Sequence, residues 1–117
     1  MSHTMDIQME LHDRRALEAA CRRLRIKMEY GKHRLHATTE DGMGVFLDGW
    51  RYPIVIKDAG TVCYDNYNGH WGNIQKLREL EAYYGLEKAK LEAQIKGYDY
   101  QETVTSDNMP RLEILID

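Results

Sequence analysis

One long pattern constrains the fold more than any other feature of the chain, a predicted helix from Asn73 to Ile95. Its apolar side chains fall within an arc of about 60° when residues are placed at 100° intervals. They are Leu77, Leu80, Tyr84, Leu91 and Ile95. Asn73 suits the N-terminal cap, and Gly97 suits the left-handed position that ends many helices. Because tertiary packing supplies most of the stability of such a helix, the rest of the chain is expected to provide a sheet that covers this stripe.

Short strands are expected on both sides of this helix. Alternating apolar and polar residues predict strands at 4–11, 26–30, 35–37, 45–47, 54–56, 61–64, 98–105 and 111–116. The first hairpin is expected to turn at Gly31-Lys32. A shorter helix is expected after Asp13, and the side chains on its buried face would be Leu17, Ala20, Cys21 and Leu24.

This order of elements predicts one α+β domain over residues 1–117. The expected architecture is an antiparallel sheet with two helices packed on one face, because runs of strands are separated by only two helical segments. A ferredoxin-like core with an inserted hairpin is one topology that fits this order.

The bulk composition is that of an ordinary folded domain. Of the 117 residues, 43% are hydrophobic and 30% are charged, and no apolar run approaches the roughly 20 residues that cross a bilayer. Since the N-terminus lacks a signal-peptide pattern, a cytoplasmic location is expected. Cys21 and Cys63 are expected to be reduced packing residues. A net charge of −3 weighs against a broad nucleic-acid surface.

Motifs that specify a reaction are absent from the sequence. The chain contains no GxSxG, P-loop, Rossmann or HExxH motif, and its histidines and cysteines do not have zinc-site spacing. No catalytic residue, cofactor or metal is therefore expected, and the absence of these motifs weighs against an enzyme. Asp65 and His70 could form an acid/base pair if their loop folded back, although hydrogen bonds that order the loop are the commoner outcome.

The long helix carries a second, weaker apolar seam nearly opposite the first stripe. This seam consists of Ala82, Leu86, Ala89 and Ala93. Small side chains let another helix approach closely, so the seam is the predicted surface for a protein partner or for self-association. The protein would then be a non-enzymatic interaction or accessory protein that acts through its long helix. The alternative is that alanine only raises helix propensity on an exposed face.

A second functional hypothesis is a module that binds a small ligand or nucleic acid. The aromatic side chains expected to stack on such a ligand are Tyr64, Tyr67, His70 and Trp71. The basic groups expected to meet its phosphates are Arg14, Arg15, Arg22 and Arg23 on the first helix, or Lys32, His33 and Arg34 in the first hairpin. Arginine pairs also serve simply to solvate a helix, and the acidic balance makes nucleic acid the less favoured partner.

Several short stretches together resemble the DUF1257 family, which includes the Ycf35-like proteins of chloroplasts and cyanobacteria. The stretches are Met1-Ser2-His3, Asp13-Arg14-Arg15-Ala16-Leu17, Asp58-Ala59-Gly60, Tyr64-Asp65, Trp71-Gly72, Tyr83-Tyr84 and Gly97-Tyr98. Thr4 and the segment 33–50 depart from the family pattern. The family consists of small soluble proteins of unknown function, found in bacteria and plastids and expected in phages. The resemblance therefore implies no catalytic residues, cofactor or partner.

Overall fold

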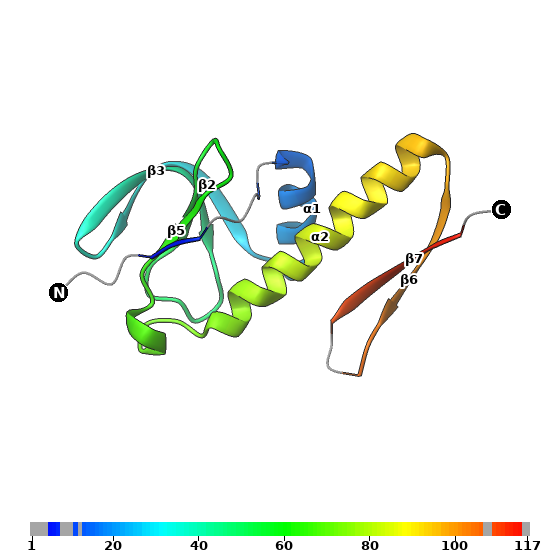
Figure 1. Ribbon diagram of the computed structural model, residues 1–117. Helices are drawn as coiled ribbons and strands as arrows, with labels where there is room; N and C mark the ends of the chain where they lie inside the picture. The colour runs from blue at the N-terminus through cyan, green and yellow to red at the C-terminus, as the bar shows by residue number, and fades with distance from the viewer. Residues whose placement is uncertain (1–4, 8–10, 12, 107–108, 116–117) are drawn as a thin grey trace.

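The structure, a computed structural model, describes residues 5–7, 11, 13–106 and 109–115 (Figure 1). Its elements are β1 (Met5–Ile7), α1 (Arg14–Leu24), β2 (Lys27–Leu35), β3 (Thr38–Phe46), β4 (Ile54–Ile56), β5 (Val62–Tyr64), the 3-10 helix η1 (Tyr67–Gly69), α2 (Ile74–Lys96), β6 (Asp99–Val104) and β7 (Pro110–Leu115). Two α-helices and antiparallel strands in these ranges confirm the predicted α+β class. Of the strand predicted at 4–11, residues 5–7 form β1, and residues 4 and 8–10 lie outside the described part.

Both helices cover the same face of a five-stranded sheet. The strand order is β1-β5-β4-β3-β2, and each neighbouring pair is antiparallel. The buried residues on this face are Val45, Ile54, Ile56, Val62 and Tyr64 of the strands, and Leu47, which follows β3. They share one core with Leu17 and Cys21 of α1 and with Leu77, Leu80 and Tyr84 of α2. Each fully buried side chain of this size contributes roughly 1.5–3 kcal/mol, so this face supplies most of the stability of the fold.

Local capping fixes where the helices begin and end, as the sequence predicts. The Asp13 carboxylate accepts the N–H groups of Arg15 and Ala16 at 3.1 and 3.3 Å, and Asn73 Oδ1 accepts the Gln75 N–H at 2.9 Å. Gly97 ends α2 with a φ of 74°. The Asp13 N–H also donates to the Tyr84 hydroxyl at 3.1 Å, which ties the start of α1 to α2.

The predicted turn at Gly31-Lys32 is wrong. β2 continues through Gly31, which pairs with Gly42 of β3, and the chain turns at His36 and Ala37 instead. Glycine favours turns, but it also permits close approach of two backbones. In this hairpin the glycines serve the second role, and the strand continues through Gly31. A Cβ on Gly42 would lie 2.6 Å from the Ile56 carbonyl oxygen.

The long β2–β3 hairpin folds back over the second face of the sheet. Leu35, near its tip, packs with Val55 of β4 and Cys63 of β5, and all three are almost fully buried. β3 pairs with β4 only at 43–45, so a straight hairpin would carry Leu35 far beyond β4. Figure 1 shows this hairpin arching on the side of the sheet away from α1 and α2.

The ferredoxin-like alternative is also wrong. In that topology the strand after the second helix rejoins the main sheet. Here, among the described strands, β6 pairs only with β7, and these two strands form a separate sheet at the far end of α2. α2 therefore runs from the five-stranded sheet to the β6–β7 hairpin along the 55 Å length of the molecule (Figure 1).

Because α2 extends past the large sheet, its predicted stripe is buried only in part. Leu77, Leu80 and Tyr84 lie in the core and Leu91 is half-buried, but Ile95 is 76% exposed. Periodicity correctly gave the direction of the stripe. The prediction that Ile95 is buried is wrong because the sheet ends before the helix does.

A cluster of charged side chains fastens the β6–β7 hairpin to both helices. Arg23 of α1 forms ion pairs with Glu87 of α2 and Glu102 of β6, and Lys90 of α2 forms ion pairs with the same two glutamates. The guanidinium of Arg23 also lies 5.0 Å from the ring centroid of Tyr83. The hydrogen bond from Arg23, with a smaller one from Lys90, lowers the pKa of the Glu102 carboxyl. The cluster is therefore expected to hold the hairpin most firmly when Glu102 is ionised.

Both cysteines are buried and outside any disulfide, which confirms their predicted packing role. Burial raises the pKa of the Cys21 thiol to about 12, so this thiol stays protonated and unreactive at neutral pH. In the part of the chain that the structure describes, no helix is long and apolar enough to cross a membrane.

Two glycine substitutions should have opposite effects on stability. Gly42→Ala should lower the free energy of unfolding by about 1–3 kcal/mol, because the new methyl group meets the Ile56 backbone and the φ of 156° disfavours a side chain. Gly85→Ala should raise it by about 0.5–1 kcal/mol, because a Cβ at this position of α2 meets nothing within 4 Å. Urea denaturation measures both. Equal effects from the two variants would contradict the folded-back hairpin.

Acidification should weaken the attachment of the β6–β7 hairpin. Since the folded state lowers the pKa of Glu102, its contribution is fully present above the ordinary pKa of 4.5 and is lost as the pH falls through the lower, folded value. Glu102→Gln should therefore destabilise the protein by roughly 1 kcal/mol at pH 7 and by less at about pH 3, which lies below the ordinary pKa of 4.5. Urea denaturation at both pH values measures this, with Glu92→Gln on the exposed side of α2 as the control. A Glu102→Gln effect that does not change with pH would argue against the ionic attachment.

Candidate functional site

Five aromatic and imidazole side chains gather on the side of the sheet opposite the helices. We call this group, His36, Tyr52, Tyr67, His70 and Trp71, the aromatic cluster. Trp71 is its centre, with ring centroids 4.8 Å from His36, 5.6 Å from Tyr52 and 4.8 Å from Tyr67. Tyr67 also contacts His70 at 4.9 Å. These distances are typical of interacting rings, so the cluster is a packed unit.

Three separate segments of the chain build the aromatic cluster. His36 comes from the tip of the β2–β3 hairpin, and Tyr52 from the connection between β3 and β4. Tyr67, His70 and Trp71 come from the connection between β5 and α2, which contains η1. The folded-back hairpin is what brings His36 to the other two segments.

Backbone hydrogen bonds fix Trp71 in its place. Its carbonyl accepts the Arg51 N–H at 2.8 Å, and its own N–H donates to the Asn66 carbonyl at 2.9 Å. Asn66 is buried and donates from Nδ2 to the Gly72 carbonyl at 3.2 Å. A Cβ on Gly72 would lie 2.4 Å from the Trp50 ring, so only glycine lets the chain pass this close to Trp50. The loop is held rigidly before any ligand arrives.

Backbone strain is concentrated at the same place. His36, Tyr67 and Asn68 have positive φ values of 67°, 46° and 52°. The remaining described non-glycine residue with positive φ, Arg25, ends α1. Such conformations cost of order 1–3 kcal/mol and collect at functional sites, where the surrounding structure holds them. Here the buried Asp65 carboxylate accepts the Tyr67 N–H at 3.1 Å and supports the strained turn.

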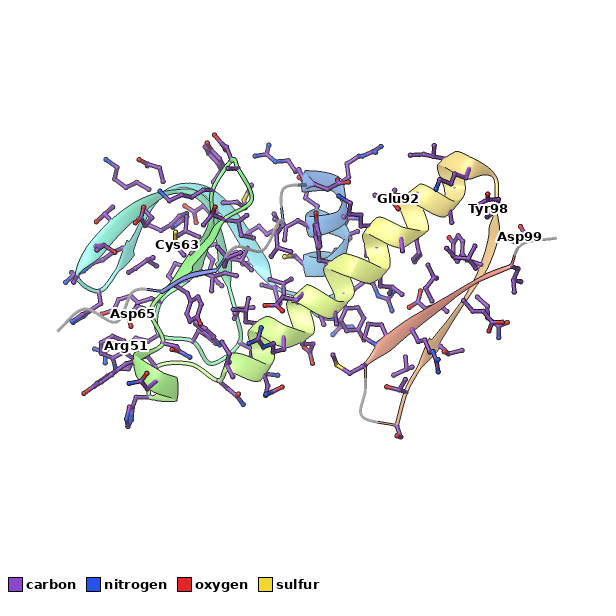
Figure 2. All side chains as sticks on the ribbon, viewed as in Figure 1. Arg51, Cys63, Asp65, Glu92, Tyr98 and Asp99 are labelled. Carbon is purple, nitrogen blue, oxygen red and sulfur yellow. The ribbon has the colours of Figure 1, made fainter. Side chains whose placement is uncertain are left out.

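Two arginines border the aromatic cluster. The guanidinium of Arg51 lies 5.5 Å from the Trp71 centroid and 5.8 Å from the Tyr52 centroid. Arg34 Nε donates to the His36 carbonyl at 3.1 Å, and both arginines are exposed. Among the described residues, no carboxylate forms an ion pair with either. Figure 2 shows Arg51 and Asp65 at this end of the molecule, and Tyr98 and Asp99 at the other.

The structure brings together three of the four predicted stacking residues. Tyr67, His70 and Trp71 belong to the aromatic cluster, and Tyr67 is 39% exposed. Tyr64 is buried on the opposite face, where its ring meets the edge of Trp50 at 5.7 Å. Tyr64 therefore supports the core and not the site.

The predicted basic residues of α1 lie away from the aromatic cluster, because α1 packs on the other face of the sheet. Arg14 stacks at 5.6 Å over Tyr30 and lines a hollow of about 150 Å³, and Arg23 belongs to the charged cluster beside β6. Arg15 and Arg22 are exposed on the helix surface. Of the three hairpin residues predicted as the alternative phosphate-binding groups, Lys32, His33 and Arg34, only Arg34 borders the aromatic cluster.

His33 packs elsewhere on the hairpin. Its ring meets Phe46 edge-on at 5.8 Å, and a Cβ on Gly44 would lie 2.4 Å from its Nε2 atom. Lys32 is exposed on β2.

The second seam of α2 is largely packed inside the chain. The C-terminal half of α2 lies against the β6–β7 hairpin and is linked to it by Lys90 and Gln94. Leu86 is 5% exposed and Ala93 is 1% exposed, whereas Ala82 and Ala89 are half-buried. A partner would find only the two alanines partly accessible.

The sequence left open an acid/base pair of Asp65 and His70, and the structure gives Asp65 another role. Asp65 is buried and orders the turn at Tyr67, whereas His70 is exposed with its ring against Tyr67. Within the described ranges, no three histidine, cysteine, aspartate or glutamate side chains gather as metal ligands would. The chemistry that this arrangement offers is stacking and charge.

Sequence reasoning missed His36, Arg51 and Tyr52. His36 was hidden because the predicted turn at Gly31-Lys32 placed it on a returning strand. Arg51-Tyr52 precedes Pro53, and an aromatic residue beside a proline in a loop was the one available signal.

Comparisons with known proteins give no information about the function of this site, so the site is interpreted from its geometry alone. No family model, curated protein or solved structure matches the chain. The resemblance to the DUF1257 family stays a prediction.

Proposed function

We propose that the aromatic cluster binds a ligand that carries a nucleobase and a phosphate, either a free nucleotide or a short single strand. The observation that carries the proposal is Trp71, held between ring side chains and beside the exposed guanidinium of Arg51. Aromatic side chains next to cationic groups are the usual means of holding single-stranded nucleic acid.

The exposed rings offer a stacking surface. Tyr67 and His70 are exposed at the edge of the aromatic cluster, while Trp71 and Tyr52 are half-buried behind them. Stacking of a base on an aromatic side chain contributes about 1–3 kcal/mol and does not depend strongly on the base. A rigid loop loses little conformational entropy on binding, which favours such a surface over a flexible one.

The charges around the aromatic cluster suit a ligand with few phosphates. Arg34 and Arg51 are the basic groups that border it, and a guanidinium can bind phosphate with two parallel hydrogen bonds. The net charge of −3 for the whole chain opposes a long polyanion. A nucleotide or a strand of a few nucleotides fits both the two bordering arginines and the negative net charge of the chain. The negative net charge is therefore compatible with the ligand-binding hypothesis.

An interaction protein is the second candidate function. It is favoured by apolar side chains that stay exposed on the β6–β7 hairpin, at the opposite end of the molecule from the aromatic cluster. The two functions use different surfaces, so evidence for one does not exclude the other.

Stacking can be tested with two tyrosine variants of equal exposure. Tyr67 and Tyr98 are each 39% exposed, and Tyr98 lies at the other end of the molecule from Arg51, which borders the aromatic cluster (Figure 2). Tyr67→Ala should weaken binding of a nucleoside monophosphate or of a short fluorescently labelled oligothymidylate by about tenfold, and Tyr98→Ala should leave it unchanged. Calorimetry measures the first ligand and fluorescence anisotropy the second. Tighter binding of the oligonucleotide would identify a strand as the ligand, and tighter binding of the monophosphate would identify a nucleotide. The proposal fails if neither ligand binds at low salt, or if both variants weaken binding equally.

The salt dependence of binding should be shallow. With two arginines contacting phosphates, the logarithm of the association constant for a single strand should fall with the logarithm of salt concentration with a slope of about −1.4. Arg51→Gln should reduce the magnitude of this slope by about 0.7, whereas Arg22→Gln on α1 should not change it. Anisotropy titrations at several salt concentrations give these slopes. A slope as steep as about −4, or equal effects of the two variants, would indicate a broad basic surface and not this site.

A further inference from the structure

The β6–β7 hairpin ends in an unpaired strand edge. β7 pairs with β6 along one side, from Asp99–Leu115 to Val104–Pro110, and no other described strand pairs with its second side. A two-stranded sheet is marginally stable alone, and open edges tend to pair with other strands. Apolar side chains remain accessible on this hairpin, with Val104 57%, Ile114 40% and Leu115 45% exposed.

The register of the hairpin shows which groups point to the open edge of β7. The Thr105 N–H donates to the Met109 carbonyl at 2.9 Å, so these two residues are a hydrogen-bonded pair. Antiparallel pairs alternate, which places Arg111 and Glu113 in the positions bonded to β6. The backbone N–H and C=O groups of Leu112 and Ile114 then point to the open edge.

We propose that two copies of this chain pair antiparallel through β7, with Leu112 opposite Leu112 of the second copy. This register lets the outward groups of Leu112 bond to each other across a two-fold axis, as a symmetric dimer requires. It also places Arg111 opposite Glu113 of the second copy, and Glu113 opposite Arg111. The seam is therefore complementary in charge to itself at two symmetric positions.

Other registers of β7 lose this complementarity. Pairing about Glu113 would set two carboxylates directly opposite each other, and like charges in that position repel. Pairing about Ile114 would set Glu113 opposite Leu115 and leave Arg111 opposite no residue of β7. Within one chain Arg111 and Glu113 face the neutral Thr103 and Gln101 across the hairpin, so their charges lack opposite charges as cross-strand partners.

The open edge of β6 is a poorer match to itself. Its outward backbone groups belong to Tyr100, Glu102 and Val104, and the side chains of Tyr100 and Glu102 already bond to Gln94 and Lys90 of α2. Pairing about Tyr100 sets Asp99 opposite Gln101, and pairing about Glu102 sets Gln101 opposite Thr103. Neither arrangement joins opposite charges, so β7 is the edge that we assign to the second copy.

The seam is short, so the dimer should be weak. Pro110 has no N–H, which leaves about four backbone hydrogen bonds across the two-fold axis. Such a contact lies at the small end of protein interfaces, and a dissociation constant of about 1–100 μM is expected.

Charge reversal tests the register directly, with sedimentation velocity on the full chain at concentrations up to about 1 mM. The wild type should dimerise with rising concentration. Glu113→Arg leaves only arginines at the seam and Arg111→Glu leaves only glutamates, so each variant alone should dimerise about tenfold more weakly or not at all. An equimolar mixture of the two should dimerise like the wild type, because each arginine then faces a glutamate. Glu29→Arg on β2 is the control, with the same charge change far from β7, and should behave like the wild type.

The outcomes separate the proposal from unfolding and from other interfaces. The double variant Arg111→Glu with Glu113→Arg restores complementarity within one chain and should dimerise, which keeps the test valid if a single variant folds poorly. A wild type that stays monomeric at about 1 mM overturns the proposal. So do single variants that dimerise as tightly as the wild type, or a mixture that does not recover dimerisation.

Discussion

The close approach of the β2–β3 hairpin to the second face of the sheet is the contact on which the rest of the structure depends. Gly42 places no side chain between the hairpin and the Ile56 carbonyl of β4, and Gly44 leaves room for the His33 ring within the hairpin itself. The same approach lays Leu35 over Val55 and Cys63 and brings His36 to Trp71. The second core and the aromatic cluster therefore both depend on this one approach.

Structural features that depend on residues close in sequence could be predicted. Features that depend on the contact of the β2–β3 hairpin with the sheet could not. The caps at Asp13, Asn73 and Gly97 depend on a few adjacent residues, and all three formed as expected. Glycine favours turns, which predicts a turn at Gly31, but the role of Gly31 is set by its pairing with Gly42 of another strand. The exposure of Ile95 has a similar origin, since helical periodicity gives the direction of a stripe and not the extent of the sheet beneath it.

The residues of the candidate site also fall into two groups, those that are neighbours in sequence and those that only the fold brings together. Tyr67, His70 and Trp71 share one loop, so composition alone placed them together. His36 and Tyr52 join them only through the folded-back hairpin and the connection after β3, which no local pattern reveals. Amphipathicity showed that the arginines of α1 point to solvent, but it could not show that α1 and the aromatic cluster lie on opposite faces of the sheet.

α2 sets the relation between the two proposed surfaces. It begins at Asn73, immediately after the aromatic cluster, and ends at Gly97, immediately before β6, so the site and the β7 edge lie at opposite ends of a 55 Å molecule. A dimer joined through β7 would carry its two aromatic clusters at its outer ends. A ligand of a few nucleotides could not bridge them, so dimerisation would leave the affinity for such a ligand unchanged, and only a strand long enough to span the dimer would gain from binding at both ends.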